Sequence, residues 1–145
     1  MKSTTTVNIV NRKAKFDYHL EKSEVAGIVL MGSEVKSIRT GKVNMTDSFC
    51  VFEDGELWIR NMHISSPGNA YSHDPVRARK VLLKRKELNK LEKDLIKGYT
   101  IIPVRIFSNA ENLLKVEICL AKGKKQFDKR ETIKERDIQR EINRE

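Results

Sequence analysis

The sequence predicts a mainly β protein: a small closed antiparallel barrel of about six strands with flanking helices and a basic C-terminal tail. Short apolar or alternating segments recur through the first 120 of the 145 residues, and their spacing leaves too little chain for the crossover helices of a parallel sheet. Large apolar residues become sparse after Leu120. We therefore expect one barrel domain over residues 1–120 and a tail over residues 121–145.

The first elements are expected before residue 43. Residues 7–12 have mixed polarity and indicate a semi-ordered lead-in. Residues 16–21 alternate between apolar and polar side chains, which predicts a half-buried strand. Residues 25–31 form a β-branched apolar run with glycines at bend positions, which predicts a second, central strand. Residues 33–42 are polar, with two apolar residues three apart, and indicate a short helix or turn.

A hairpin and a helical segment are expected in the middle of the chain. Residues 48–53 and 56–62 flank the Asp54-Gly55 dipeptide, which favours the positive φ angles of a type I′ turn. Pro75 has the position of a first helical residue, and leucines recur near the 3.6-residue period up to Lys97. We expect a helix over residues 75–97, or two helices separated by a break near Lys84.

Two further strands complete the predicted barrel. Residues 100–107 and 113–120 are β-rich and joined by a polar turn, and Pro103 indicates an unpaired edge within the first of them. Residues 121–145 hold nine Lys or Arg and six Asp or Glu, too polar a composition to build a core. The strand count and the helical insertion favour a barrel of the oligonucleotide-binding (OB) type, with a tail that is disordered when free.

The charge of the chain predicts a polyanionic partner. Lys and Arg number 29 against 20 Asp and Glu, a formal charge of +9. The longest non-polar run spans residues 25–32, far short of the roughly 20 residues of a membrane helix. Bases recur from Lys13 to Arg144 rather than on one amphipathic helix, so nucleic acid is favoured over a membrane surface. The N-terminus has no apolar signal core, which predicts a cytoplasmic location.

Catalytic and metal-binding motifs are scarce. His19, His63 and His73 lie in different segments without metal-ligand spacing, and the two cysteines lie in apolar stretches typical of inert buried thiols. Two histidines acting as general acid and base leave a small metal-independent ribonuclease as an alternative. The stretch from Arg77 to Lys93 carries eight bases against two Glu, an imbalance that favours a polyanion partner over a merely solvated helix.

Three separated segments resemble one known family. They are GSEVKSIRTGKVNMTDSF at residues 32–49, DPVRARKVLLKRKEL at residues 74–88 and LAKGKKQFDKRETIKERD at residues 120–137. In this order they are similar to the SsrA-binding protein (small protein B) family, the partner of transfer-messenger RNA in bacterial ribosome rescue. The resemblance spans residues 11–137.

The resemblance implies an OB-type barrel without enzymatic activity, cofactor or metal. It implies binding to the tRNA-like domain of transfer-messenger RNA and delivery of that RNA to stalled ribosomes. Elongation factor Tu and alanyl-tRNA synthetase are implied as indirect partners reached through the RNA. The tail is implied to enter the decoding centre and the vacant mRNA channel of the ribosome. An ordinary ribosomal or structured-RNA-binding protein with a basic tail is the alternative.

The residues expected to act fall into two groups. The RNA-binding set, drawn from the motif at residues 32–49 and the basic stretch, comprises Gly32, Glu34, Lys36, Ser37, Arg39, Lys42, Asn44, Arg77, Arg79, Lys80, Leu82 and Lys84. The ribosome-binding tail set comprises Lys122, Lys124, Lys125, Asp128, Lys129, Arg130, Lys134, Arg136, Ile138 and Ile142. Glu34 is expected either to accept a hydrogen bond from a base edge or to hold Lys36 and Arg39 in position.

Overall fold

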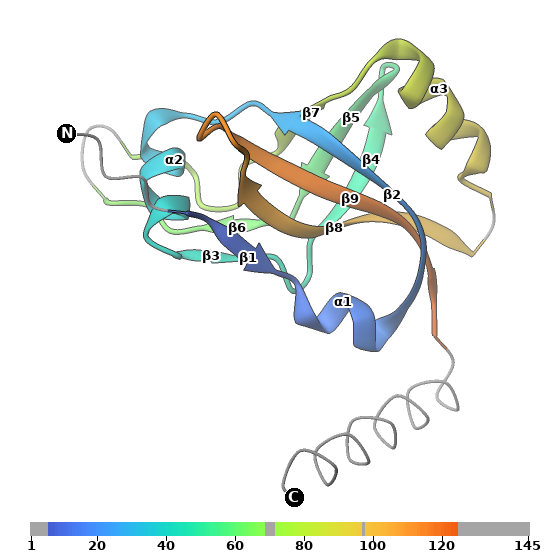
Figure 1. Ribbon diagram of the computed structural model, residues 1–145, viewed down its shortest axis with the longest axis horizontal. Helices are drawn as coiled ribbons and strands as arrows, with labels where there is room; N and C mark the ends of the chain where they lie inside the picture. The colour runs from blue at the N-terminus through green and yellow to red at the C-terminus, as the bar shows by residue number, and fades with distance from the viewer. Residues whose placement is uncertain (1–5, 69–71, 97, 125–145) are drawn as a thin grey trace, which may run out of the picture.

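The structure, a computed structural model, describes residues 6–68, 72–96 and 98–124 (Figure 1). Its elements in chain order are β1 (Asn8–Val10), α1 (Arg12–Asp17), β2 (Tyr18–Ile28), α2 (Gly32–Arg39), β3 (Val43–Asn44), β4 (Phe49–Glu53), β5 (Glu56–Arg60), β6 (His63–Ile64), β7 (Arg79–Leu82), α3 (Arg85–Asp94), β8 (Tyr99–Ser108) and β9 (Leu114–Gly123).

The main sheet closes on itself. Its order is β1-β8-β4-β5-β7-β2-β9, and β9 also pairs with β8, so that six strands from β8 round to β9 form a ring. All of these pairings are antiparallel, and β1 extends the ring at the edge of β8. The short strands β3 and β6 form a separate two-stranded sheet. The predicted closed antiparallel barrel is therefore confirmed.

The core fills the inside of this ring. Alternate residues of the strands point inward and are at most 1% exposed, among them Leu57, Ile59, Val81, Ile101, Ile106, Val116 and Ile118. Helices α2 and α3 lie at opposite ends of the barrel (Figure 1) and contribute Ile38 and the pair Leu88 and Leu91 to this core. Each buried Leu, Ile or Val contributes about 1.5–3 kcal/mol relative to an exposed one, so the closed ring is the stable body of the protein.

The N-terminal region differs from its prediction. Residues 18–28 form one continuous strand, β2, which pairs with β9 and has an irregularity between Leu20 and Lys22. Residues 12–17 form a helix because Ala14 packs on Ile102 and Ala121 in a small second core outside the ring. The expected strand at 16–21 and the expected separate strand at 25–31 were therefore wrong in their boundaries. The lead-in is partly a strand, since β1 pairs with β8.

The helix predicted over residues 75–97 was wrong in its first half. Residues 79–82 form β7, which lies between β5 and β2. Arg79 and Val81 are buried whereas Lys80 and Leu82 face outward, which is the two-residue alternation of a strand. The helical spacing of the leucines from Leu82 onward led to the prediction of a helix instead. Helix α3 begins at Arg85 with Lys84 as its N-cap, so a boundary does lie near Lys84, but it separates a strand from a helix and the expected pair of helices was wrong.

Several other expectations are confirmed or extended. Asp54 and Gly55 have φ angles of 52° and 76° and join β4 to β5 as predicted. The segment at 33–42 is mainly helix α2, and β8 and β9 form where expected. Strand β9 passes the expected boundary at Leu120 and ends at Gly123, because β2 continues to pair with it up to Tyr18. Within the described ranges no helix is both long and apolar enough to cross a bilayer.

The β4–β5 turn gives a direct test of the hairpin. We expect Gly55→Ala to lower the free energy of unfolding by about 1 kcal/mol, because alanine resists the positive φ of 76° found there. Urea unfolding followed by circular dichroism measures this change. Gly123→Ala is the control, since Gly123 does not have a positive φ and a Cβ there meets no atom within 4 Å. Equal stability of the two variants would contradict the turn assignment.

Candidate nucleic-acid interface

Helix α2 is anchored to the barrel by a buried ion pair. Glu34 and Arg79 are both 0% exposed, and Arg79 Nε donates to Glu34 Oε2 at 2.5 Å. Arg77 Nη2 donates to Glu34 Oε1 at 2.5 Å from the protein surface. The Met31 amide also donates to Glu34 Oε1, at 2.7 Å, which closes the first turn of α2. One carboxylate thus joins α2 to β7 and to the segment before it.

The guanidinium of Arg79 is fully enclosed by acceptors. Its Nη1 donates to Met62 O at 2.5 Å and its Nη2 to Pro75 O at 3.1 Å. Burial raises the pKa of Glu34, but the hydrogen bonds from Arg77, Met31 and Arg79 outweigh it and leave the pKa below the ordinary value. Burial lowers the pKa of Arg79, and Glu34 opposes that shift. The pair is therefore a charged structural link inside the fold.

This burial corrects three sequence predictions. Glu34 and Arg79 cannot touch RNA in this conformation because neither has an exposed atom. Glu34 holds Arg77 and Arg79 rather than Lys36 and Arg39. Arg39 instead donates to Asn112, from Nη1 to Oδ1 at 3.1 Å and from Nη2 to the carbonyl at 2.8 Å. Glu34 and Arg39 on α2, through Arg77, Arg79 and Asn112, therefore hold the helix against the barrel.

A hollow of about 410 Å³ opens between α2 and the segment that follows β6. We call it the α2 hollow, and its lining residues are Gly32, Ser33, Lys36, Ser37, Thr40, Lys42, Ser65, Ser66 and Pro67. Four of the predicted RNA-binding residues line it: Gly32, Lys36, Ser37 and Lys42. Among the residues that the structure describes, the lining contains two ammonium groups and five hydroxyl groups but no carboxylate. It therefore suits an anionic ligand rich in hydrogen-bonding groups.

Hydrogen bonds fix the two walls of the α2 hollow against each other. Ser37 Oγ donates to Ser65 O at 2.6 Å, and the Ser65 amide donates to Lys42 O at 3.0 Å. His73 is 6% exposed and bridges the walls, with Nδ1 2.8 Å from Ser33 Oγ and Nε2 2.8 Å from Ile64 O. The hollow is consequently a built feature of the fold.

A second surface lies on the outside of β2 and β7. Val25 and Leu82 are 52% and 49% exposed, and Leu82 lies over Gly27, where an added Cβ would be only 3.2 Å from that of Leu82. Lys80 and Lys84 flank Leu82 along the chain, and Lys84 is exposed. We call these four side chains, Val25, Lys80, Leu82 and Lys84, the β7–α3 surface. Apolar side chains beside lysines suit an unstacked base and its phosphate.

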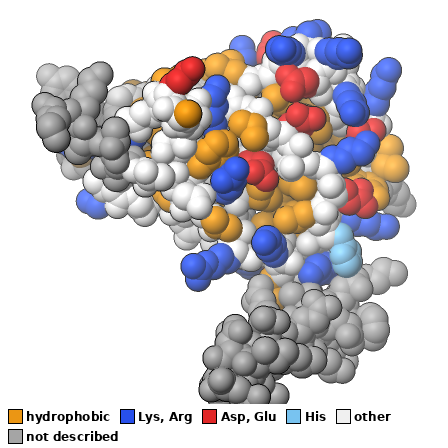
Figure 2. Space-filling model, in the orientation of Figure 1, with side chains coloured by type: hydrophobic (Ala, Val, Ile, Leu, Met, Phe, Trp, Pro, Cys, Tyr) orange, Lys and Arg blue, Asp and Glu red, His pale blue; other side chains and the backbone are white. Residues whose placement is uncertain are grey.

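Basic side chains extend this surface over α3. Figure 2 shows Lys and Arg side chains around the end of the molecule that carries α3, with acidic side chains among them. Some of the bases are paired: Lys80 Nζ is 3.7 Å from Glu56 Oε2, and Arg85 Nη2 donates to Glu56 Oε1 at 3.1 Å. Lys84 itself caps α3. The predicted excess of bases is thus partly neutralised at Glu56.

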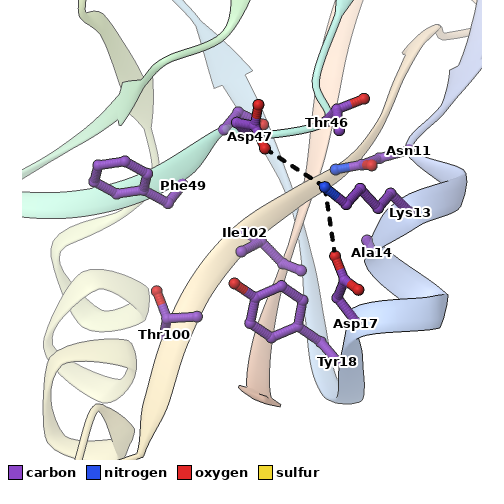
Figure 3. A pocket seen from close by; sticks show the side chains of 11 residues that line it. Asn11, Lys13, Ala14, Asp17, Tyr18, Thr46, Asp47, Phe49, Thr100 and Ile102 are labelled. Atoms are coloured by element: carbon purple, nitrogen blue, oxygen red, sulfur yellow. Dashed lines mark ion pairs between the residues drawn. The ribbon is translucent and has the colours of Figure 1, made fainter. Parts of the chain in front are cut away.

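A different pocket of about 280 Å³ lies beside α1 (Figure 3). Figure 3 shows Lys13 reaching between two carboxylates, with its Nζ 4.0 Å from Asp17 Oδ2 and 3.7 Å from Asp47 Oδ1. Tyr18 and Phe49 also line this α1 pocket. Two carboxylates against one ammonium make it less suited to phosphate than the α2 hollow. No pattern in the sequence indicates this pocket, because its lining comes from separate segments of the chain.

The remaining predicted residues are placed as follows. Asn44 is exposed, and its Oδ1 accepts from the Thr46 amide at 2.9 Å. Lys122 belongs to β9 and lies over the Tyr99 ring, and the Lys124 amide donates to Asp17 O at 2.8 Å. These two lysines of the predicted tail therefore sit on the barrel. The other tail residues, Lys125, Asp128, Lys129, Arg130, Lys134, Arg136, Ile138 and Ile142, lie outside the described residues.

The two histidines considered for a ribonuclease lie in different environments. Both ring nitrogens of His73 are engaged inside the fold, whereas His63 is exposed on β6. Cys50 and Cys119 are free and buried, and burial raises the pKa of both thiols. The prediction of buried thiols is confirmed. His73 is a structural brace that the sequence could not reveal, because Ser33 lies 40 residues away and Ile64 contributes only its backbone carbonyl.

Comparisons with known proteins identify the family that this chain resembles. The family model described as SmpB protein matches residues 8–145. The chain is 50% identical to the SsrA-binding protein of Phocaeicola vulgatus over 97% of this chain and 95% of that protein. It is 51% identical to the SsrA-binding protein of Flavobacterium psychrophilum over 96% of this chain and 95% of that protein. The structure is also similar to a chain in a solved structure described as "tmRNA-SmpB: a journey to the center of the bacterial ribosome", with a TM-score of 0.69 and 41% identity. This match covers 89% of the present chain and 94% of the other.

The buried pair predicts a stability effect with a defined pH dependence. We expect Glu34→Gln to lower the free energy of unfolding by about 3–5 kcal/mol at neutral pH, because Arg79 is left buried without a counter-charge. Since the folded pKa of Glu34 is depressed, the wild type loses this stabilisation as pH falls below the ordinary glutamate pKa. The difference in the free energy of unfolding between the wild type and Glu34→Gln should therefore become smaller in acid.

Denaturant titrations at a series of pH values measure this difference. Glu111→Gln is the matched control, since Glu111 is exposed in the β8–β9 turn and should change stability little. A Glu34→Gln protein as stable as this control at neutral pH would show that the carboxylate does not hold the fold together.

Proposed function

The chain belongs to the SmpB protein family, and we propose that it binds transfer-messenger RNA as a factor of trans-translation, using the α2 hollow and the β7–α3 surface. The observation that carries the proposal is a preformed hollow whose described lining residues provide two lysines and five hydroxyl groups and no carboxylate. The α2 segment that forms one wall belongs to the motif that resembles the family. Folded RNA is bound by basic surfaces and hydrogen-bonding loops, as found on this barrel.

The proposal divides the chain into a binding body and a tail. The barrel holds the tRNA-like domain, and the basic segment after residue 124 enters the decoding centre and mRNA channel of a stalled ribosome. Nine bases and six acids in residues 121–145 suit a segment that is ordered by ribosomal RNA. Elongation factor Tu and alanyl-tRNA synthetase act on the RNA rather than on this protein. The site of action is the cytoplasm, where ribosomes translate.

Two alternatives are separable from this proposal. A general structured-RNA-binding protein would bind ribosomal RNA fragments as tightly as transfer-messenger RNA. A ribonuclease would cleave RNA in a way that depends on His63, since His73 is enclosed. We propose no catalytic step, and RNA that stays intact on prolonged incubation with the full chain is the expected result.

The first functional prediction concerns the lysines of the α2 hollow. We expect the double variant Lys36→Gln, Lys42→Gln to bind transfer-messenger RNA about 10-fold more weakly or worse, and its affinity to fall less steeply with salt because fewer counterions are released. Titration at several salt concentrations measures both effects. The control Lys13→Gln, Lys22→Gln removes two lysines that are already paired with Asp17, Asp47 and Asp94. An equal loss in both proteins would contradict the assignment of the hollow.

The second functional prediction separates the barrel from the tail. A chain ending at Lys124 retains all of β9, so we expect it to fold, bind transfer-messenger RNA and fail to support peptide tagging on stalled ribosomes. Unfolding, RNA titration and a reconstituted tagging assay measure the three properties. The triple substitution Asp128→Ala, Lys129→Ala, Arg130→Ala in the full chain should reproduce much of the tagging loss. Full tagging by the shortened chain, or loss of its RNA binding, would contradict the division.

A further inference from the structure

The hydroxyl groups on the α2 wall of the hollow use their protons in hydrogen bonds within the protein. Ser37 Oγ donates to Ser65 O at 2.6 Å, and Thr40 Oγ1 donates to Ser37 O at 3.0 Å and Lys36 O at 3.3 Å. A hydroxyl has one proton and two lone pairs, and a carbonyl can only accept. Ser37 and Thr40 therefore offer lone pairs, and no proton, to a ligand in the hollow.

The same conclusion holds for Ser33, through the tautomer of His73. His73 Nε2 lies 2.8 Å from Ile64 O, which has no proton to give, so Nε2 must carry the ring proton. Nδ1 of the neutral ring is then an acceptor, and Ser33 Oγ, 2.8 Å away, donates to it. A buried His73 thus uses up the proton of a third hydroxyl that lines the hollow.

This arrangement defines the chemistry of the ligand. Phosphate oxygens are acceptors and find donors at Lys36 and Lys42, but they gain nothing from three hydroxyl oxygens that can only accept. A ligand that hydrogen-bonds to these three hydroxyl groups therefore supplies donors of its own, and the two lysines favour a ligand with negative charge. A ribonucleotide backbone does both, since each residue has a phosphate and a 2′-hydroxyl that can donate.

We infer that the α2 hollow recognises RNA by its 2′-hydroxyl groups, with Ser33, Ser37 and Thr40 as acceptors and Lys36 and Lys42 on the neighbouring phosphates. The inference rests on the proposed function and specifies the group that is recognised. It also gives His73 the role of a positioning residue, which sets the direction of the Ser33 hydroxyl. The 2′-hydroxyl is the group by which a protein distinguishes RNA from DNA.

The amino groups of RNA bases could donate to the same three hydroxyl oxygens, and an experiment distinguishes them from 2′-hydroxyl groups. The full-length protein is titrated with a synthetic tRNA-like domain of transfer-messenger RNA in which single 2′-hydroxyl groups are replaced by hydrogen, one position at a time. We expect at least one position where the replacement weakens binding about threefold to tenfold, the effect of one lost hydrogen bond. Bases and phosphates are unchanged in this series, so base amino groups cannot cause the loss.

Substitutions in the protein locate the effect. In Thr40→Val the acceptor is removed, so binding should be weaker with the unmodified RNA and no longer respond to the sensitive 2′-deoxy position. Ser37→Ala should behave in the same way if the fold is kept, which circular dichroism checks. The matched control is Thr100→Val, because Thr100 lines the α1 pocket and its loss should leave the 2′-deoxy response intact.

The outcomes separate this inference from the proposed function. Tight binding that is insensitive to every single 2′-deoxy replacement would overturn the inference and leave the proposed function standing. A 2′-deoxy response that persists undiminished in both Thr40→Val and Ser37→Ala would also overturn it, because the hydroxyl would then be recognised elsewhere. If the wild-type protein failed to bind the tRNA-like domain at all, both the proposed function and this inference would be wrong.

Discussion

The buried contact between Glu34 and Arg79 is the constraint on which the rest of the molecule depends. Two charges with no exposed atoms are tolerable in a protein interior only when their hydrogen-bonding groups are nearly all satisfied. Met31, Met62, Pro75 and Arg77 meet this requirement, and they come from three parts of the chain, since Pro75 and Arg77 share the segment before β7. Satisfying one ion pair therefore fixes the start of α2, the chain after β5 and the approach to β7.

The position of α2 in turn determines the recognition surface. The helix offers Lys36 and hydroxyl groups to the hollow, Lys42 follows just after it, and Ile38 is packed into the core. Its facing wall is held by Ser65 and by His73, so the α2 hollow keeps its shape without a ligand. A preformed site loses less conformational entropy on binding than a loop that must be ordered. The α1 pocket, with its paired charges, lies on another part of the barrel and has a different chemical character.

Elements set by neighbouring residues could be predicted from the sequence, whereas elements set by partners distant along the chain could not. The Asp54-Gly55 turn requires positive φ at adjacent residues, a property of those residues alone. Residues 79–82 were assigned to a helix because the leucines after them have helical spacing, yet pairing with β5 and β2 makes them a strand. Glu34 is predicted to bind RNA because it is the one acid in the basic motif at residues 32–42 that resembles the family, and nothing near it in the sequence indicates Arg79, 45 residues away, as its partner. Polar residues are usually exposed, and an exception of this kind requires the whole fold.

Hydrogen exchange measured by mass spectrometry, on the full chain with and without the tRNA-like domain of transfer-messenger RNA, tests the central claim most directly. The claim is that a helix fixed by a buried ion pair presents the RNA-binding hollow. RNA should slow exchange in peptides that cover residues 32–42 and 65–67, and leave the α1 pocket segment at residues 46–49 unchanged. Protection confined to the α1 pocket, with no change in the α2 segment, would contradict the account.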